Sequence, residues 1–213
     1  MSLIAYTRTQ LVTQVRAQIQ ERTASMVTDA EIQRWLDIAL LDVAASTHCL
    51  RATASAACSA SQQMYTLSAT CLGPWALTRV EYAGRKLECK SFDTIDEVLG
   101  GSNLSSQGDP MYYFAYGRQI GLWPVPAVNS AVLKYWYARH SESLSADAMS
   151  ITTLGFSLAH GPAIESYATA RGLQFKGKLQ EAQGALQAYQ RDLSRADGKV
   201  MPDNVPDELR SSG

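Results

Sequence analysis

The chain lacks the segments that mark export or insertion into a membrane. No apolar run approaches the roughly 20 residues that span a bilayer, and the amino-terminal residues show no basic stretch followed by a hydrophobic signal region. We therefore expect no membrane partner and a protein that is made and kept in a cytoplasm.

Cysteine is scarce and not arranged for metal or redox chemistry. The cysteines stand at Cys49, Cys58, Cys71 and Cys89 and form no CxxC pair, so neither a zinc site nor a redox motif is indicated. We expect reduced, mostly buried thiols. Glycines at positions 100, 101 and 108 match neither a phosphate-binding loop nor a dinucleotide fingerprint, so the sequence predicts no cofactor and no metal.

An excess of charge of one sign is also missing. The chain has 19 Lys plus Arg against 20 Asp plus Glu, a formal charge of −1. Division at residues 50 and 140 leaves no strongly basic block. Because strong binding of nucleic acid needs clustered cations, this charge balance argues against a dedicated nucleic-acid-binding surface.

Histidine-based catalytic groups are not apparent. His48 and Cys49 are neighbours, but adjacent residues on a helix point about 100° apart and cannot face each other. Ser157 precedes His160 and Gly161-Pro162, which is typical of a helix start rather than of a Ser-His pair. His140 follows a strand pattern, and we expect it to be exposed. No catalytic residue is predicted.

Carboxylates could still form a hydrolytic pair, since glycosidases place two of them about 5 to 9 Å apart. Glu81 and Glu88 flank a predicted turn at residues 83–85 and could be cross-strand neighbours. Asp93, Asp96 and Glu97 lie on a short predicted helix, where Asp93 near the start is favoured by the peptide dipoles. Solvent-exposed faces are the ordinary explanation for both groups, and we expect no enzyme.

The clearest element is an amphipathic helix over residues 28–44. Thr28 and Glu31 have the spacing of a capping box. Apolar residues recur at helical spacing and make one wide stripe, which needs a cover: Ile32, Trp35, Leu36, Ala39, Leu40, Val43 and Ala44.

Helical patterns at both ends of the chain can supply that cover. A short upstream helix is predicted around Leu11 to Ile19, and one or two helices downstream between Ile164 and Leu193. Between them, strand patterns with turn signals occupy residues 64–67, 77–82, 86–90, 111–116, 119–123 and 132–139. The predicted class is α+β, with an antiparallel β lobe inserted in a helical bundle.

The expected domain boundaries follow from these patterns. Residues 1–50 and 155–197 form the bundle, and residues 51–154 form the β lobe, which includes a mobile loop at 100–110. The stretch 52–61 is richer in Ala and Ser than we expect of a strand. Residues 198–213 form an extended tail with intermittent apolar residues, which suits either a frayed end or a docking peptide.

Aromatic residues occupy both faces of two predicted strands. Tyr112, Phe114 and Tyr116 project to the face opposite Tyr113, and Tyr135 and Tyr137 oppose Trp136. A small β lobe has one interior, so either it folds as a sandwich with some rings outside, or another molecule covers the second face. Three explanations stay open: half-exposed strand tyrosines, a subunit interface, or a platform that stacks on sugars.

Four segments in order resemble the head-to-tail adaptor proteins of tailed bacteriophages. These are residues 28–44, 79–88, 108–114 (Gly-Asp-Pro-Met-Tyr-Tyr-Phe) and 120–126 (Ile-Gly-Leu-Trp-Pro-Val-Pro), and the likeness runs from about residue 9 to residue 195. The resemblance implies a structural protein of the virion, assembled in the host bacterial cytoplasm. Copies would form a homo-oligomeric ring, typically a dodecamer, beneath the portal protein, where it would extend the DNA channel and receive a tail or nozzle protein.

A head-to-tail ring requires two different contact patches on each subunit. The rings that could supply them, and that we expect at the subunit interface, are Tyr112, Phe114, Tyr116, Trp123, Tyr135 and Tyr137. The tail residues expected to dock on the portal are Val200, Met201, Val205 and Leu209. Near-neutral charge suits passage of DNA through the lumen without specific binding.

Two alternatives belong to other functional classes. One is a tail-associated module that binds glycans through Tyr112, Tyr116, Trp123 or Trp136. The other is a cell-wall hydrolase, which would depend on Glu81 or Glu88.

Overall fold

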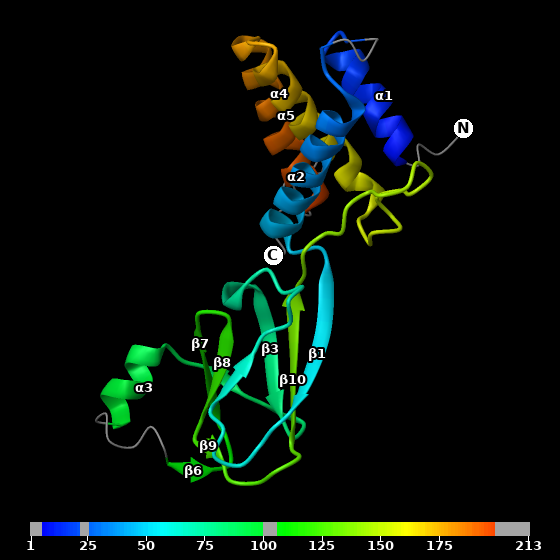
Figure 1. Ribbon diagram of the computed structural model, residues 1–213. Coiled ribbons are helices and arrows are strands. Elements are labelled where there is room, and N and C mark those ends of the chain that lie inside the picture. Colours follow the sequence, from blue (N-terminus) through cyan, green and yellow to red (C-terminus); the bar gives the residue numbers. More distant parts are fainter. Residues whose placement is uncertain (1–5, 22–25, 100–105, 199–213) are drawn as a thin grey trace, which may run out of the picture. The chain divides into compact units, whose positions relative to one another are not determined.

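The chain forms two compact units in the computed structural model, which describes residues 6–21, 26–99 and 106–198. One unit combines residues 1–47 with 141–213, and the other consists of residues 48–140. The first unit is helical, and the second contains the strands and helix α3 (Figure 1). The expected α+β class, with helices from both ends of the chain in one bundle, is confirmed. Within the described ranges, no helix is long and apolar enough to span a membrane.

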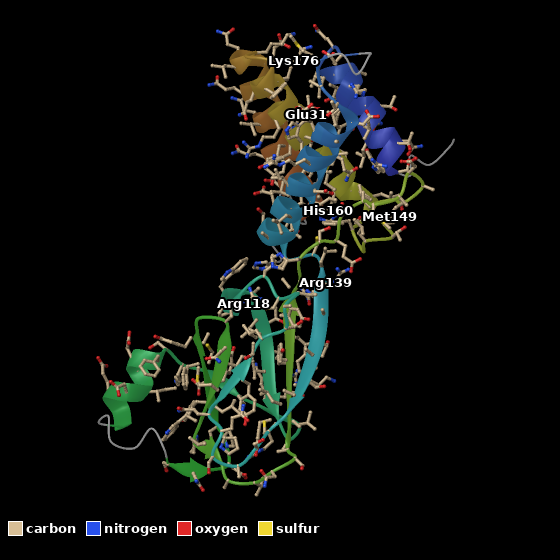
Figure 2. All side chains as sticks on the ribbon, in the orientation of Figure 1. Glu31, Arg118, Arg139, Met149, His160 and Lys176 are labelled. Carbon is tan, nitrogen blue, oxygen red and sulfur yellow. The ribbon has the colours of Figure 1, made fainter. Side chains whose placement is uncertain are left out.

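The helical unit contains α1 (Arg8–Gln18), α2 (Asp29–Thr47), the 3-10 helix η2 (Leu158–His160), α4 (Gly161–Phe175) and α5 (Leu179–Ala196). The capping box before α2 is present. The Thr28 amide donates to Oε2 of Glu31 at 2.7 Å, and the Glu31 amide donates to Oγ1 of Thr28 at 3.2 Å. These hydrogen bonds favour the charged carboxylate and lower the pKa of Glu31, which Figure 2 labels.

Helix α4 contacts α1, α2 and α5, so the N- and C-terminal helices share one apolar interior. Close packing depends on Gly172, where a Cβ atom would lie 2.8 Å from Cγ2 of Ile19 and 3.0 Å from Cζ3 of Trp35. Trp35 itself is only half-buried, with its ring 5.9 Å from that of Phe175. It therefore lies at the edge of the apolar stripe, while the fully buried α2 residues are Ile32, Leu36, Ala39, Leu40, Val43 and Ala44.

Residues 141–154 belong to the helical unit rather than to the β lobe, where we had expected them. The Arg8 amide donates to the Met149 carbonyl at 2.9 Å, and Ser143 Oγ donates to the Asp37 carboxylate at 2.9 Å. The segment also buries Leu144, Ile151 and Leu154. It is an irregular cover for the bundle, which has no periodicity that sequence reasoning can detect.

Two four-stranded sheets make up most of the β unit. The first has the order β1 (Arg51–Ala57), β10 (Val132–Ala138), β3 (Leu77–Tyr82), β4 (Arg85–Lys86). The second has the order β2 (Met64–Thr66), β8 (Gln119–Trp123), β7 (Tyr112–Tyr116), β5 (Glu88–Cys89). The remaining elements are β6 (Gln107–Gly108), β9 (Val125–Pro126), α3 (Phe92–Leu99) and the 3-10 helix η1 (Pro74–Ala76).

The two sheets enclose a single apolar core, as in a sandwich. Its residues include Tyr65, Val80, Tyr82, Tyr113, Ile120, Leu122, Leu133, Tyr135 and Tyr137. Most neighbouring strands are antiparallel, while β5 runs parallel to β7 and β6 parallel to β9. Strand β1 forms despite its Ala and Ser content because β10 pairs with it along its whole length and Ala52, Ala54 and Ala56 pack on the core.

One strand prediction for the β lobe needs correction, and the predicted loop and tail lie partly outside the described residues. The expected strand 86–90 is divided, because Leu87 is buried between β4 and β5, which join different sheets. The expected loop 100–110 lies partly outside the described ranges, and its last part forms β6. Of the expected tail, residues 199–213 also lie outside them.

The cysteines, all within the described ranges, form no disulfide. Cys58 and Cys71 are buried, Cys49 is half-buried and Cys89 is exposed. Burial raises the pKa of the Cys58 and Cys71 thiols, so both favour the neutral, unreactive form.

Candidate interaction surface

Aromatic rings gather on the outer face of the sheet β2-β8-β7-β5. Tyr112 pairs across the strands with Trp123, Phe114 with Gly121, and Tyr116 with Gln119. Since Tyr113, Ile120 and Leu122 point into the sandwich core, alternation places the other residues of these strands on the outer face. We call this surface the aromatic face and define it by Met64, Phe92, Tyr112, Phe114, Tyr116 and Trp123.

Phe114 is the buried centre of the aromatic face. Its ring covers Gly121, where a Cβ atom would lie 2.1 Å from Cζ of Phe114, so only glycine fits beneath it. Phe92 of α3 packs against Phe114, with ring centroids 5.4 Å apart, and Phe114 is 1% exposed. The prediction that Phe114 lies at a subunit interface is therefore wrong, since the chain's own helix covers it.

Other rings of the aromatic face remain accessible. Tyr116 is 65% exposed and its ring lies 6.0 Å from that of Phe92. A shallow depression of about 320 Å³ lies beside them and is lined by Gln63, Met64, Phe92, Phe114, Tyr116 and Gln119. We therefore treat this surface as a candidate contact with another protein.

Tyr112 and Trp123 form a stacked pair at the other end of the aromatic face. Their ring centroids are 5.9 Å apart with an interplanar angle of 22°, and both side chains are half-buried. Lys90 Nζ lies 5.6 Å from the Tyr112 ring centroid, within the range of a cation–π contact. The pair is thus a partly accessible aromatic surface beside Lys90, whose charge is balanced by Glu88.

Tyr135 and Tyr137 do not lie on a surface. They are 4% and 3% exposed and point into the sandwich core, so their predicted place at a subunit interface is wrong. The Ser68 amide donates to the Tyr135 hydroxyl at 2.9 Å, and the Tyr137 hydroxyl lies 2.9 Å from Oγ1 of Thr70. Burial raises the pKa of Tyr135. The predicted alternation in β10 is correct, but the sequence did not indicate which of its faces turns inward.

Trp136 takes the outward position in β10, on the opposite sheet from Tyr112, Tyr116 and Trp123. Its ring lies beneath two cations, with Lys134 Nζ 4.8 Å and Arg79 Cζ 5.3 Å from the centroid. The rings considered for sugar stacking therefore do not form one platform, which weakens the glycan-binding alternative.

The predicted carboxylate pair is not formed. Glu81 faces Lys86 across β3 and β4, whereas Glu88 pairs with Tyr112 in the other sheet. Each is neutralised locally, Glu81 by Arg79 and Glu88 by Lys90. The chain crosses between the sheets after Leu87, which separates two residues that a simple hairpin would bring together.

The histidine candidates have structural surroundings. Ser157 caps η2 by accepting from the Ala159 amide at 3.2 Å, as expected. His160, labelled in Figure 2, is buried with its ring 5.9 Å from that of Phe156. The His48 ring packs at 5.2 Å on Trp75, and α2 ends before it at Thr47. His140 is half-buried rather than exposed, and its amide donates to the Thr70 carbonyl at 2.8 Å.

Two further sequence predictions concern metal ligands and the tail. Across residues 6–21, 26–99 and 106–198, no group of three or more His, Cys, Asp or Glu side chains could hold a metal ion. The expected docking residues Val200, Met201, Val205 and Leu209 lie outside the described residues. Sequence reasoning missed Phe92 and Met64, although the apolar first residue of a short acidic helix was a usable signal for Phe92.

Comparison with known proteins gives one family. A family model described as SU10 adaptor protein matches residues 6–210 and so covers both units. No curated protein matches the chain.

Proposed function

The chain belongs to the SU10 adaptor protein family of phage head–tail adaptors, and we propose that its copies form a ring beneath the portal protein. Membership makes it a structural component of a phage virion and not a member of an enzyme family. In the proposed role the ring is dodecameric, extends the DNA channel and docks the next tail or nozzle protein. The observation that carries the proposal is the family match across both the bundle and the β unit.

The aromatic face supports assembly with other copies. Tyr116 is exposed at one end of this face, and Tyr112 stacks on Trp123 at the other. Tyrosine and tryptophan supply large contact area at low entropic cost and are enriched at protein interfaces. Of the six rings first expected at the interface, we retain Tyr112, Tyr116 and Trp123 for this role.

The charge balance supports passage of DNA without specific binding. The formal charge of the chain is −1, so a ring of such subunits carries no overall excess of cations. A lumen rich in Lys and Arg would hold phosphates tightly and make passage strongly dependent on salt. In the proposed ring the lumen has no such excess of cations, which permits sliding.

The proposed portal contact is the tail, through Val200, Met201, Val205 and Leu209. In the sequence these apolar residues are sparse, and Pro202 and Pro206, which disfavour helix, stand among them. An extended peptide with apolar anchors suits docking into a groove of a partner.

Sedimentation velocity of the purified protein, alone and mixed with portal, tests the proposal. We expect a complex with portal whose mass requires several adaptor copies. Tyr116→Ser should reduce the number of copies bound, whereas Val128→Ser, which replaces another exposed apolar residue of the β unit, should not. Protein that never associates with portal at any salt concentration would refute the adaptor role.

A further inference from the structure

Most charged side chains of the β unit have polar partners within it. Ion pairs join Arg79 to Glu81, Arg85 to Asp109 and Lys90 to Glu88. Two further arginines, labelled in Figure 2, donate to backbone carbonyls: Arg118 to those of Ser68, Ala69 and Cys71, and Arg139 to that of His140. Only six charged residues are left over.

These six residues divide equally by sign. Within the described part of the unit, none of them forms an ion pair: Arg51, Lys86 and Lys134, and Asp93, Asp96 and Glu97. All six are exposed. Lys134 also contacts the Trp136 ring, and the charges of all six remain accessible to a partner.

The three cations share one surface, the outer face of the sheet β1-β10-β3-β4. Lys134 faces Glu81 across the strands and Glu81 faces Lys86, so both lysines project to the same side. Arg51 belongs to the exposed set of β1, whose alternate residues pack inward. Trp136 lies among them, and the small residues Thr53 and Ser55 leave the surface open. We call this the cationic face and define it by Arg51, Lys86, Lys134 and Trp136.

The three acids lie on α3, on the opposite side of the unit. Helix α3 attaches through Phe92 to Phe114 and Tyr116 on the aromatic face. The aromatic and cationic faces are the two outer surfaces of the sandwich. Figure 1 shows α3 beside β7, on the side away from β1. The β unit therefore has a positive outer surface on one side and a negative outer surface on the opposite side.

We propose that the cationic face of one copy docks on α3 and the aromatic face of the next copy. The inference rests on the proposed ring and names the two surfaces that join its subunits. Lys86, Lys134 and Arg51 would meet Asp93, Asp96 and Glu97, and Trp136 would approach Tyr116. Each side then has an aromatic centre and a charged rim of opposite sign, which is the usual anatomy of a protein interface.

The geometry suits a ring because the contact is heterologous. Each copy uses one surface to meet its predecessor and the opposite surface to meet its successor, so the contact repeats until it closes. Equal and opposite charges orient the docking and disfavour the reversed arrangement, in which like charges would meet. A DNA partner would account for the cations but leave the matching acidic set unexplained. Neutralisation between neighbours also removes a cationic surface that would hold DNA.

Disulfide trapping captures this contact even when it is transient. Cys89→Ser first removes the exposed native thiol, and Ser55→Cys and Asp93→Cys then place one thiol on each surface. Under mild oxidation we expect a ladder of linked oligomers, formed both alone and on portal. The matched control, Thr66→Cys with Asp93→Cys, puts both thiols on the α3 side and should not give a ladder.

Charge-reversal variants test whether the opposite charges of the two surfaces drive the contact. Lys86→Glu with Lys134→Glu, or Asp96→Lys with Glu97→Lys, should each slow trapping by about tenfold at low salt. Mixing the two reversed proteins should restore trapping. The protein with Lys86→Glu and Lys134→Glu carries Ser55→Cys, and the protein with Asp96→Lys and Glu97→Lys carries Asp93→Cys. An acidic sheet face then meets a basic helix. Thermal melts establish that each variant is folded.

Trapping no faster than in the control pair, or unaffected by either reversal, would overturn the inference. If portal-bound oligomers still form in that case, the proposed ring stands and its contacts lie elsewhere. If no oligomer forms and portal is not bound, the proposed function fails as well. Reversal of Lys86 and Lys134 that weakens retention on double-stranded DNA but not trapping would assign the cationic face to DNA and also overturn the inference.

Discussion

Glycine at position 121 is required by the ring that lies on it. The Phe114 ring occupies the space in which any Cβ atom at this position would sit, 2.1 Å from Cζ. Phe114 is in turn held by Phe92, so it has little freedom to move aside. We expect Gly121→Ala to lower the free energy of unfolding by about 1–3 kcal/mol, measured by urea denaturation.

A second glycine provides the control for this substitution. Gly184 lies within α5 with nothing within 4 Å of its would-be Cβ, so Gly184→Ala should raise stability by about 0.5–1 kcal/mol. Combining Gly121→Ala with Phe114→Ala should cost less than the sum of the single changes. Strict additivity would contradict the proposed clash.

Lys176 and Glu21 form a nearly buried ion pair in the helical unit. Nζ of Lys176 lies 3.1 Å from Oε2 of Glu21 and also donates to the Ile19 carbonyl at 3.0 Å. The two side chains are 15% and 8% exposed. Lys176→Met leaves the carboxylate without this partner, and we expect a loss of about 3–5 kcal/mol in the free energy of unfolding.

Lys178 serves as the control, because it has the same charge as Lys176 but is less buried. Lys178 pairs with Glu181 on the surface, where the side chains are 31% and 52% exposed. Lys178→Met should therefore cost only about 0–1 kcal/mol in the same denaturation experiment. Equal losses for the two variants would show that burial of the Lys176 pair does not matter.

At the level of elements, helix α4 places the half-buried carboxylate of Glu165 beside α1 and α5. Burial and the nearby charge of Asp192 on α5 raise the pKa of Glu165, which accepts a hydrogen bond from Gln18 on α1. A raised pKa in the folded state favours the protonated form. This contribution to stability is complete below the unfolded pKa of about 4.3 and is lost as pH rises through the folded pKa.

Glu165→Gln should remove that loss, because the amide stays neutral and its oxygen can still accept from Gln18. We expect the urea midpoint of the variant to exceed that of the natural protein at neutral pH, with the difference shrinking toward about pH 4. Glu142→Gln removes a charge at an exposed position and serves as the control. A difference that grows on acidification would reverse the proposed sign.

The helices and strands themselves were largely predictable from local patterns. The capping box of Thr28 and Glu31 marked the start of α2, and the bounds 77–82 and 119–123 of β3 and β8 were correct. Strand β1 was missed as a confident element because Ala and Ser carry little strand preference. Its pairing with β10 stabilises it, and such pairing is not visible in a local window.

At the level of the whole molecule, the tail beyond Gly198 should affect attachment rather than folding. Apolar residues are sparse in this part of the sequence, so we expect deletion after Gly198 to leave the thermal midpoint unchanged. If the tail docks on portal, the same deletion should weaken portal binding by at least about tenfold in a sedimentation assay.

A full-length variant controls for the loss of chain length. Serine at positions 200, 201, 205 and 209 keeps the tail but removes its apolar anchors, and should weaken binding as much as the deletion does. A truncated protein that binds portal like the intact one would rule out the tail as the docking segment.

The sequence by itself determined the α+β class, the main helices and strands, and the family resemblance, because periodicity and capping act over a few residues. Only the tertiary structure decided that Tyr135 and Tyr137 face inward while Trp136 faces outward, since alternation assigns residues to two faces without indicating which is covered. It also decided that Glu81 and Glu88 separate, and that charges distant in the chain gather on two opposite surfaces. Those outcomes depend on how strands pair and layers stack, which are contacts between residues far apart in the sequence.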